Sequence, residues 1–327
     1  MLNYNAKKVS AEVRAELARL VPPDDLFFSS SLEEAQRITQ LLVERRYPVV
    51  FTGGGDGTVI DFIERITRVA EDMPQFPCPN IGILRLGTGN ALAQMVSSGS
   101  FASDIKAYVE NGFQDLQRLG LVEFEGRRFP FCGFGWDAEI LNDYIAVKER
   151  FKDTPFLGKF SQSLGGYGVA IGTRTIPRIF ARTVRRQTGV VTIRNLGERA
   201  YRLGVGGNVR RVIRQGETIY EGPLSAVIVG TSPYYGFGLK VLPFAGLTPH
   251  FMQVRVASIP LRAALANIGP LWNGEWYHDE MRDYYATDLL IELDQDFPFQ
   301  IGGDGQGWRR GGRFTLSEAS VQLVRFI

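Results

Sequence analysis

A glycine-rich turn between a buried strand and a helix constrains this chain more than any other feature. Residues 48–52 are a β-branched and aromatic run typical of a buried strand, and Gly53-Gly54-Gly55-Asp56-Gly57-Thr58 follows at once. Apolar residues then recur at helical spacing from Val59 to Ala70. Glycines let backbone amides approach an anion closely, and the start of the helix adds its positive end. The turn therefore predicts a phosphate site at Gly53, Gly54, Gly55, Gly57 and Thr58, with a plain tight turn as the alternative.

A second turn repeats this design one strand later. Residues 81–84 are strand-like, and Leu86-Gly87-Thr88-Gly89-Asn90 leads from them into a short apolar helix. The Thr88 hydroxyl can contact a phosphate, and Asn90 can either cap the helix or reach a phosphate. Because parallel strands end at one edge of a sheet, we expect the two turns to lie side by side.

The order of elements predicts an α/β fold with two domains. Strands and helices alternate over the first hundred residues, as in a doubly wound parallel sheet with helices on both faces. After about residue 115, short strands with hairpin-like turns indicate a mostly antiparallel β region. We expect an α/β nucleotide-binding domain at 1–116, a β-rich domain at 117–309, a tail of about 310–327 that returns to the first domain, and an active site in the cleft between them.

Composition excludes several classes of protein. Hydrophobic residues make up 44% and charged residues 22% of the chain, which is typical of soluble globular proteins. The net charge of +2 predicts no nucleic-acid partner. No apolar run approaches the ~20 residues of a membrane-spanning helix, and we expect a cytoplasmic protein. The two histidines lack neighbouring partner clusters, which argues against a histidine-centred metal site or a serine triad.

Common nucleotide-binding motifs do not fit the glycine turns. The chain has no Gly-x-x-x-x-Gly-Lys-[Ser/Thr] sequence, and it lacks the protein-kinase motif set. Thr58 stands where a dinucleotide fingerprint has its third glycine, and the turn comes too late in the chain for a first βα unit.

Gly54-Gly55-Asp56-Gly57-Thr58 and Gly87-Thr88-Gly89-Asn90 together resemble the catalytic domain of the diacylglycerol kinase and sphingosine kinase family. Residues 131–139, 236–245 and 301–306 resemble further family segments in the same order. The resemblance implies that the β-rich domain binds lipid. It also implies that ATP, with Mg²⁺, phosphorylates a hydroxyl of a diacylglycerol-like or sphingoid lipid.

The resemblance also implies roles for individual side chains. Asp56 is the carboxylate that holds Mg²⁺ or accepts a proton from the attacking hydroxyl, and both roles stay open. Asp137 corresponds to a possible lipid head-group contact, with a surface aspartate as the alternative. Asp304 and Gln306 lie where the family carries catalytic Asp-Gly-Glu. Asp61 matches an acidic position on the helix after the first turn.

Three positions depart from the family pattern. Gln306 replaces the family glutamate, and an amide cannot accept a proton; loss of a general base costs about 10²–10⁴-fold in rate. Residues 247–251 lie where relatives carry Asp-Asp-Gly, so we expect a structural Mg²⁺ site of the family to be absent. Ala91 replaces a common aspartate after the second turn.

A lipid substrate requires access to a membrane, so we expect a peripheral enzyme that visits the inner membrane face. Arg174, Arg178, Arg182 and Arg185 share one face of a predicted helix, either as a membrane-binding stripe or as a solvated face. Gln306 leaves open a catalytically impaired sensor of nucleotide and lipid. An NAD kinase-like enzyme shares the first turn, although the motifs after residue 130 argue against it. No feature predicts an oligomeric state.

Overall fold

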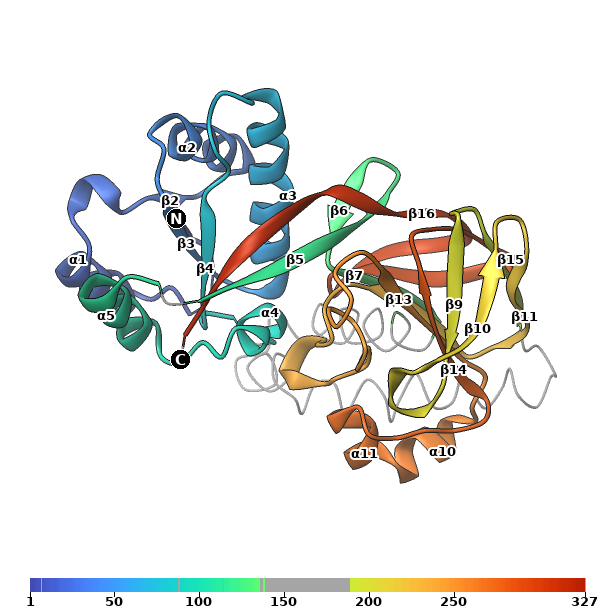
Figure 1. Ribbon diagram of the computed structural model, residues 1–327. Coiled ribbons are helices and arrows are strands. Elements are labelled where there is room, and N and C mark those ends of the chain that lie inside the picture. The colour runs from blue at the N-terminus through green and yellow to red at the C-terminus, as the bar shows by residue number, and fades with distance from the viewer. Residues whose placement is uncertain (7, 88, 114, 136–137, 139–188, 327) are drawn as a thin grey trace.

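The computed structural model describes residues 1–327 except 7, 88, 114, 136–137, 139–188 and 327. Its N-terminal part is a parallel sheet, as the alternation of strands and helices predicts. The strands are β1 (Leu2–Asn3), β2 (Phe28–Ser29), β3 (Val49–Gly53) and β4 (Asn80–Leu84), paired in the order β4-β3-β1-β2. The helices are α1 (Ala11–Leu20), α2 (Leu32–Glu44), α3 (Asp56–Asp72), α4 (Ala91–Met95) and α5 (Phe101–Asn111) (Figure 1).

Helices cover both faces of this sheet because its strands are apolar on both faces. Val50 packs in the main core with residues of α2 and α3, whereas the adjacent Phe51 packs with α1 and α5 through the cluster around Leu17 and Ile105. Successive strand side chains point to opposite faces, so one strand supplies both cores. Serine side chains cap three of these helices, α1, α2 and α5. At α2, for example, Ser31 accepts a hydrogen bond from the Glu34 amide.

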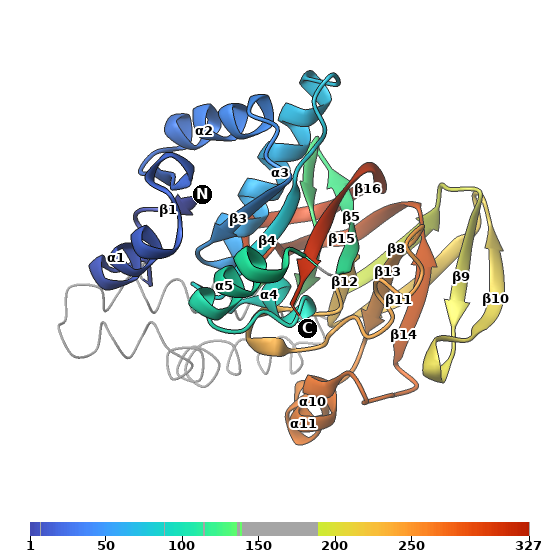
Figure 2. The ribbon, with the colours of Figure 1, turned by 60° about the vertical axis from the view of Figure 1, so that its left-hand side comes forward.

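The C-terminal part is antiparallel, again as predicted. Its strands are β5 (Asp115–Phe124), β6 (Arg127–Phe129), β7 (Phe131–Gly135), β8 (Gly189–Asn195), β9 (Arg199–Leu203), β10 (Val209–Arg214), β11 (Thr218–Leu224), β12 (Ala226–Gly230), β13 (Met252–Ala257), β14 (Met281–Ala286), β15 (Asp288–Ile301) and β16 (Asp304–Arg325). Two short helices follow β13: α10 (Leu261–Ala266) and α11 (Ile268–Asn273). Figure 2 shows the antiparallel strands beside the N-terminal helices.

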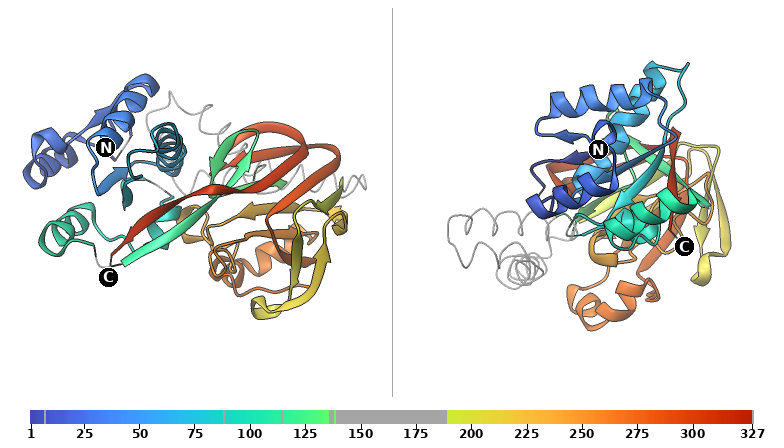
Figure 3. Two further views of the ribbon diagram at one scale, coloured as in Figure 1. Left: turned by 45° about the horizontal axis from the view of Figure 1, so that its top comes forward. Right: turned by 90° about the vertical axis from the view of Figure 1, so that its left-hand side faces the viewer.

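Two long strands connect the two parts. β5 and β16 pair antiparallel, and Leu323 near the end of β16 pairs in parallel with Ile81 of β4 (Figure 3). The strands therefore form one continuous sheet across the molecule. A domain boundary at residue 116 would fall within β5, so that division stays a prediction. No helix among the described residues is long and apolar enough to span a membrane.

Candidate active site

The two glycine turns touch each other. They follow β3 and β4, which are neighbouring parallel strands, so both leave the sheet at the same edge. A Cβ added to Gly87 would collide with the carbonyl oxygen of Gly54 and lie 2.9 Å from the Cα of Gly55. The predicted side-by-side arrangement is therefore confirmed, and it requires glycine at position 87.

The first turn leads directly into α3, so the start of this helix lies beside the contact between the turns. Gly55 is the N-cap residue and the helix begins at Asp56. No side chain of the described residues caps the helix, since glycine offers none. The first amides of a helix have no partner within it, and their dipoles favour a negative charge. The arrangement is thus suited to a phosphate near Gly57 and Thr58.

Asp56 joins the first turn to the second. Its Oδ1 accepts a hydrogen bond of 2.7 Å from the Ala91 amide at the start of α4. Its Oδ2 lies where a Cβ of Gly89 would fall, so any larger residue at position 89 would displace the Asp56 carboxylate. Ala91, one of the departures from the family pattern, takes part here through its backbone alone.

The environment of Asp56 changes its acidity. The pKa of this carboxyl group is raised to about 6, chiefly by removal from water and to a smaller extent by the nearby charge of Asp304, while hydrogen bonds from the Ala91 and Asn90 amides act in the opposite direction. A carboxylate with such a pKa is ionised at neutral pH and can still exchange a proton near that pH.

Asn90 shapes the second turn instead of capping the helix. Its backbone is left-handed, with φ of 53°, and its side-chain Oδ1 accepts a hydrogen bond of 3.0 Å from the Gly87 amide. Its Nδ2 donates to the Gly87 carbonyl oxygen over 2.8 Å. Asn90 occupies the N-cap position of α4, but its side chain makes no capping hydrogen bond. Its two hydrogen bonds close the turn around Gly87.

Residues of the first strand and the loop after it also reach the turns. The Lys8 ammonium donates a hydrogen bond of 2.7 Å to the Gly87 carbonyl oxygen, and Asn3 Nδ2 lies 3.4 Å from Thr58 Oγ1. Neither residue was identified from the sequence. The signal was available, because β1 is parallel to β3 and ends at the same edge of the sheet.

A cavity of about 280 Å³ opens beside the first turn. It lies between the start of α3, the β15–β16 turn and β6. Its lining residues are Gly57, Thr58, Ile60, Asp61, Arg127, Ile301 and Asp304. A Cβ added to Gly57 would lie 2.5 Å from Asp304 Oδ2, so the C-terminal aspartate reaches the helix N-terminus. The fold thereby brings Asp304 close to Asp56, and the two carboxylates interact.

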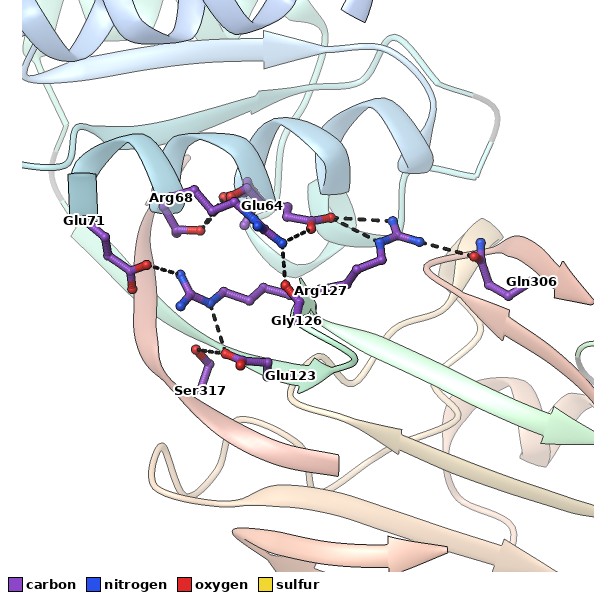
Figure 4. Close-up of polar contacts among 11 residues, drawn as sticks. Glu64, Arg68, Glu71, Glu123, Gly126, Arg127, Gln306 and Ser317 are labelled. Carbon is purple, nitrogen blue, oxygen red and sulfur yellow. Dashed lines mark hydrogen bonds and ion pairs between the residues drawn. The ribbon is translucent and has the colours of Figure 1, made fainter. Parts of the chain in front are cut away.

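Arg127 holds Gln306 at the edge of this cavity. Arg127 Nη1 donates a hydrogen bond of 3.2 Å to Gln306 Oε1, and the guanidinium forms an ion pair of 3.5 Å with Glu64 of α3 (Figure 4). Gln306 Nε2 donates to the Asp304 carbonyl oxygen over 3.3 Å. Neither Arg127 nor Glu64 was identified from the sequence, since nothing local links β6 to α3.

Three of the predicted features lie outside the described residues. They are Thr88, Asp137 and the arginine stripe at residues 174–185. Leu247 and its neighbours form turns, with Phe251 packed near Tyr285. In the part of the chain that the structure describes, no group of three or more histidine, cysteine or acidic residues could hold a metal ion.

The site thus consists of two glycine turns bridged by an aspartate beside a cavity. Residues 3–118 match the family model of the diacylglycerol kinase catalytic domain, which confirms the resemblance drawn from the two turns. No curated protein matches the chain.

Solved structures share the fold over the whole chain. A diacylglycerol kinase from Bacillus anthracis str. Sterne has 14% sequence identity and a TM-score of 0.61, covering 99% of this chain and 95% of its own. A putative diacylglycerol kinase from the same organism has 17% identity and a TM-score of 0.63, covering 99% and 93%. At such identities the comparison establishes the fold, and the sequence match of residues 3–118 carries the relation to the catalytic domain.

Proposed function

We propose that this chain is a lipid kinase that transfers the γ-phosphoryl group of ATP to a hydroxyl of a diacylglycerol-like or sphingoid lipid. The observation that carries the proposal is the contact between the two glycine turns, with Asp56 hydrogen-bonded to Ala91 across them. Backbone amides of both turns, and of the first turn of α3, would bind the phosphates. The residues of this proposed phosphate-binding site are Gly53, Gly54, Gly55, Gly57, Thr58, Gly87, Thr88, Gly89 and Asn90.

Asp56 fits a divalent cation. Its carboxylate lies beside the proposed phosphate site and near the charge of Asp304, and Mg²⁺ prefers one or two carboxylates together with phosphate oxygens. When bound, Mg²⁺ would neutralise the charge of the transferred phosphoryl group. Asp56 is the first ligand that we assign, because its position is fixed by Ala91.

Asp304 is the group that we assign to accept the hydroxyl proton. It lines the cavity in which an acceptor would lie, whereas Asp56 Oδ1 already accepts from Ala91. Gln306 cannot take this role, and its carbonyl oxygen is hydrogen-bonded to Arg127. Positioning of the acceptor between Asp304 and the phosphates supplies most of the catalysis in phosphoryl transfer. Asp137 remains our proposed contact for the lipid head group.

The test is incubation of the chain with γ-labelled ATP, Mg²⁺ and a lipid extract. We expect labelled lipid from the parent, none from Asp56→Asn, and a rate reduced about 10²–10⁴-fold in Asp304→Asn. Asp72→Asn, an exposed carboxylate at the far end of α3, is the matched control and should act like the parent.

Other outcomes identify the alternatives. Nucleotide binding without transfer to any lipid, at high enzyme concentration, would contradict the kinase and support a sensor of nucleotide and lipid. The motivating observation for that sensor is Gln306, an amide held by Arg127 where the family has a catalytic glutamate. Labelled NADP formed from added NAD would contradict the lipid kinase in favour of an NAD kinase-like enzyme.

A further inference from the structure

An arginine-rich hairpin forms one edge of the C-terminal sheet. β9 and β10 make up this hairpin, and β10 is the outermost strand of the sheet path within the described residues (Figure 2). Residues 199–214 contain no acidic residue, in a chain whose net charge is only +2. The exposed arginines are Arg199, Arg202, Arg210, Arg211 and Arg214.

Four of these arginines stand opposite one another. The register pairs Arg211 with Arg202 and Arg214 with Arg199. Like charges directly opposite in an antiparallel pair are destabilising. Exposed glutamates outside the hairpin contact Arg199 at 3.3 Å and Arg211 at 3.9 Å, and surface pairs of this kind stabilise little. The hairpin therefore concentrates positive charge, and the repulsion lowers the stability of the folded chain.

Protection of a sheet edge does not explain the pattern. Charged residues on an edge strand prevent pairing with another chain, which accounts for the arginines of β10 alone. β9 is an inner strand, paired with both β10 and β14, yet it carries Arg199 and Arg202. The hairpin also exposes apolar side chains, with 66% of Val205, 54% of Val209 and 48% of Val212 accessible. Exposed valines favour association with an apolar partner.

We propose that the β9–β10 hairpin docks on the anionic phospholipid surface of a membrane. Its arginines would contact lipid phosphates, and its valines would enter the boundary between head groups and acyl chains. A nucleic acid would satisfy the arginines but would leave the valines exposed. The inference rests on the proposed function in one respect, since a lipid kinase must approach the bilayer that contains its substrate.

The hairpin is connected to the candidate active site through a packed segment. Leu203 of β9 packs in a buried cluster with Phe244 and Tyr285. The chain that leads to Phe244 begins near Gly236, whose Cα would lie 3.1 Å from a Cβ added to Gly89 in the second glycine turn. Docking of the hairpin would therefore hold a segment that also contacts the nucleotide turns.

The experiment is co-sedimentation of the full chain with vesicles, without ATP. Vesicles of phosphatidylglycerol and phosphatidylcholine are compared with vesicles of phosphatidylcholine alone. We expect binding to the anionic vesicles only, weakened at about 0.5 M salt because surface charges are screened. The variant Arg202→Gln/Arg211→Gln/Arg214→Gln should bind about 10²-fold more weakly, at about five-fold per arginine.

A control variant removes equal charge elsewhere. Arg118→Gln/Arg309→Gln/Arg310→Gln changes three exposed arginines of β5 and β16 and should bind like the parent. Val205→Ser/Val209→Ser should weaken binding with no change of charge. The hairpin variant should unfold at the same temperature as the parent or higher, since it loses both like-charge pairs. A lower unfolding temperature for the hairpin variant than for the parent would contradict the inference that the like-charge pairs destabilise the fold.

Several results would overturn the proposal. They are absence of parent binding to anionic vesicles, unchanged binding by the hairpin variant, and equal loss in the control variant. Hairpin-dependent binding of a single-stranded oligonucleotide in place of vesicles would overturn it as well. Because sedimentation involves no turnover, failure of the kinase proposal and failure of the docking proposal give different results.

Discussion

Asp56 occupies a position in which its charged form is disfavoured. The folded chain removes this carboxyl group from water and places Asp304 nearby, yet it also fixes Asp56 Oδ1 on the Ala91 amide. Groups held at a cost to stability are common at functional sites, where the arrangement serves chemistry instead of the fold.

The raised pKa of Asp56 predicts a dependence of stability on pH. Between pH 3.8 and about 6 the folded chain retains a proton on Asp56 that the unfolded chain has released. Raising the pH through this window therefore lowers the free energy of unfolding, by about 3 kcal/mol. Asp56→Asn keeps an oxygen for the Ala91 amide and avoids the charge. We expect it to unfold at a higher temperature than the parent at pH 7, with the difference shrinking toward pH 4.

Thermal unfolding of both proteins from about pH 4 to 8 measures this effect. A parent that is more stable than Asp56→Asn at pH 7 would contradict the assigned environment of Asp56.

A second prediction at the scale of single residues concerns Gln306. A glutamate at this position would meet the Arg127 guanidinium, which would lower the pKa of the new carboxyl group and make it a poor proton acceptor. We expect Gln306→Glu to change kcat by less than about ten-fold. Combining it with Arg127→Gln should raise kcat above that of Arg127→Gln alone. A large gain from Gln306→Glu by itself would show that the missing carboxylate limits the rate.

The two strand–turn–helix units form the framework of the site at the element scale. Each begins with a buried strand, β3 or β4, and each glycine turn leaves the sheet at the same edge. Contact between the turns depends on the absence of side-chain atoms at Gly87 and Gly89. The turns therefore act as one unit, and disturbing either should disturb both.

Gly87→Ala tests this unit. The added methyl group would collide with the Gly54 carbonyl oxygen, so the turns must separate or strain, at about 1–3 kcal/mol. We expect a lower urea midpoint than in the parent. Gly269→Ala is the matched control, because a Cβ there meets no atom within 4 Å and alanine favours its helix α11. Equal midpoints for the parent and Gly87→Ala would show that the turns are not in contact.

At the scale of the whole molecule, elements set by local sequence patterns could be predicted, and contacts between distant segments could not. Apolar periodicity and the glycine turns predicted the parallel sheet, the antiparallel region and the contact between the turns. Long-range pairings have no local signal. Arg127 meets Glu64 and Gln306 only because β6 packs on α3 and β16 begins beside it. The crossing of β16 from the cavity to β4 likewise follows from pairing with β5, which no local pattern along 304–325 shows.

Calorimetric titration of the chain with Mg-ATP tests the central claim, that amides of the two touching turns bind the phosphates of a nucleotide. We predict heat from one bound ATP per chain, affinity at least ten-fold weaker in Gly87→Ala, and parent-like affinity in Gly269→Ala. No heat and no measurable affinity in the parent, or equal affinity in Gly87→Ala, would contradict the account.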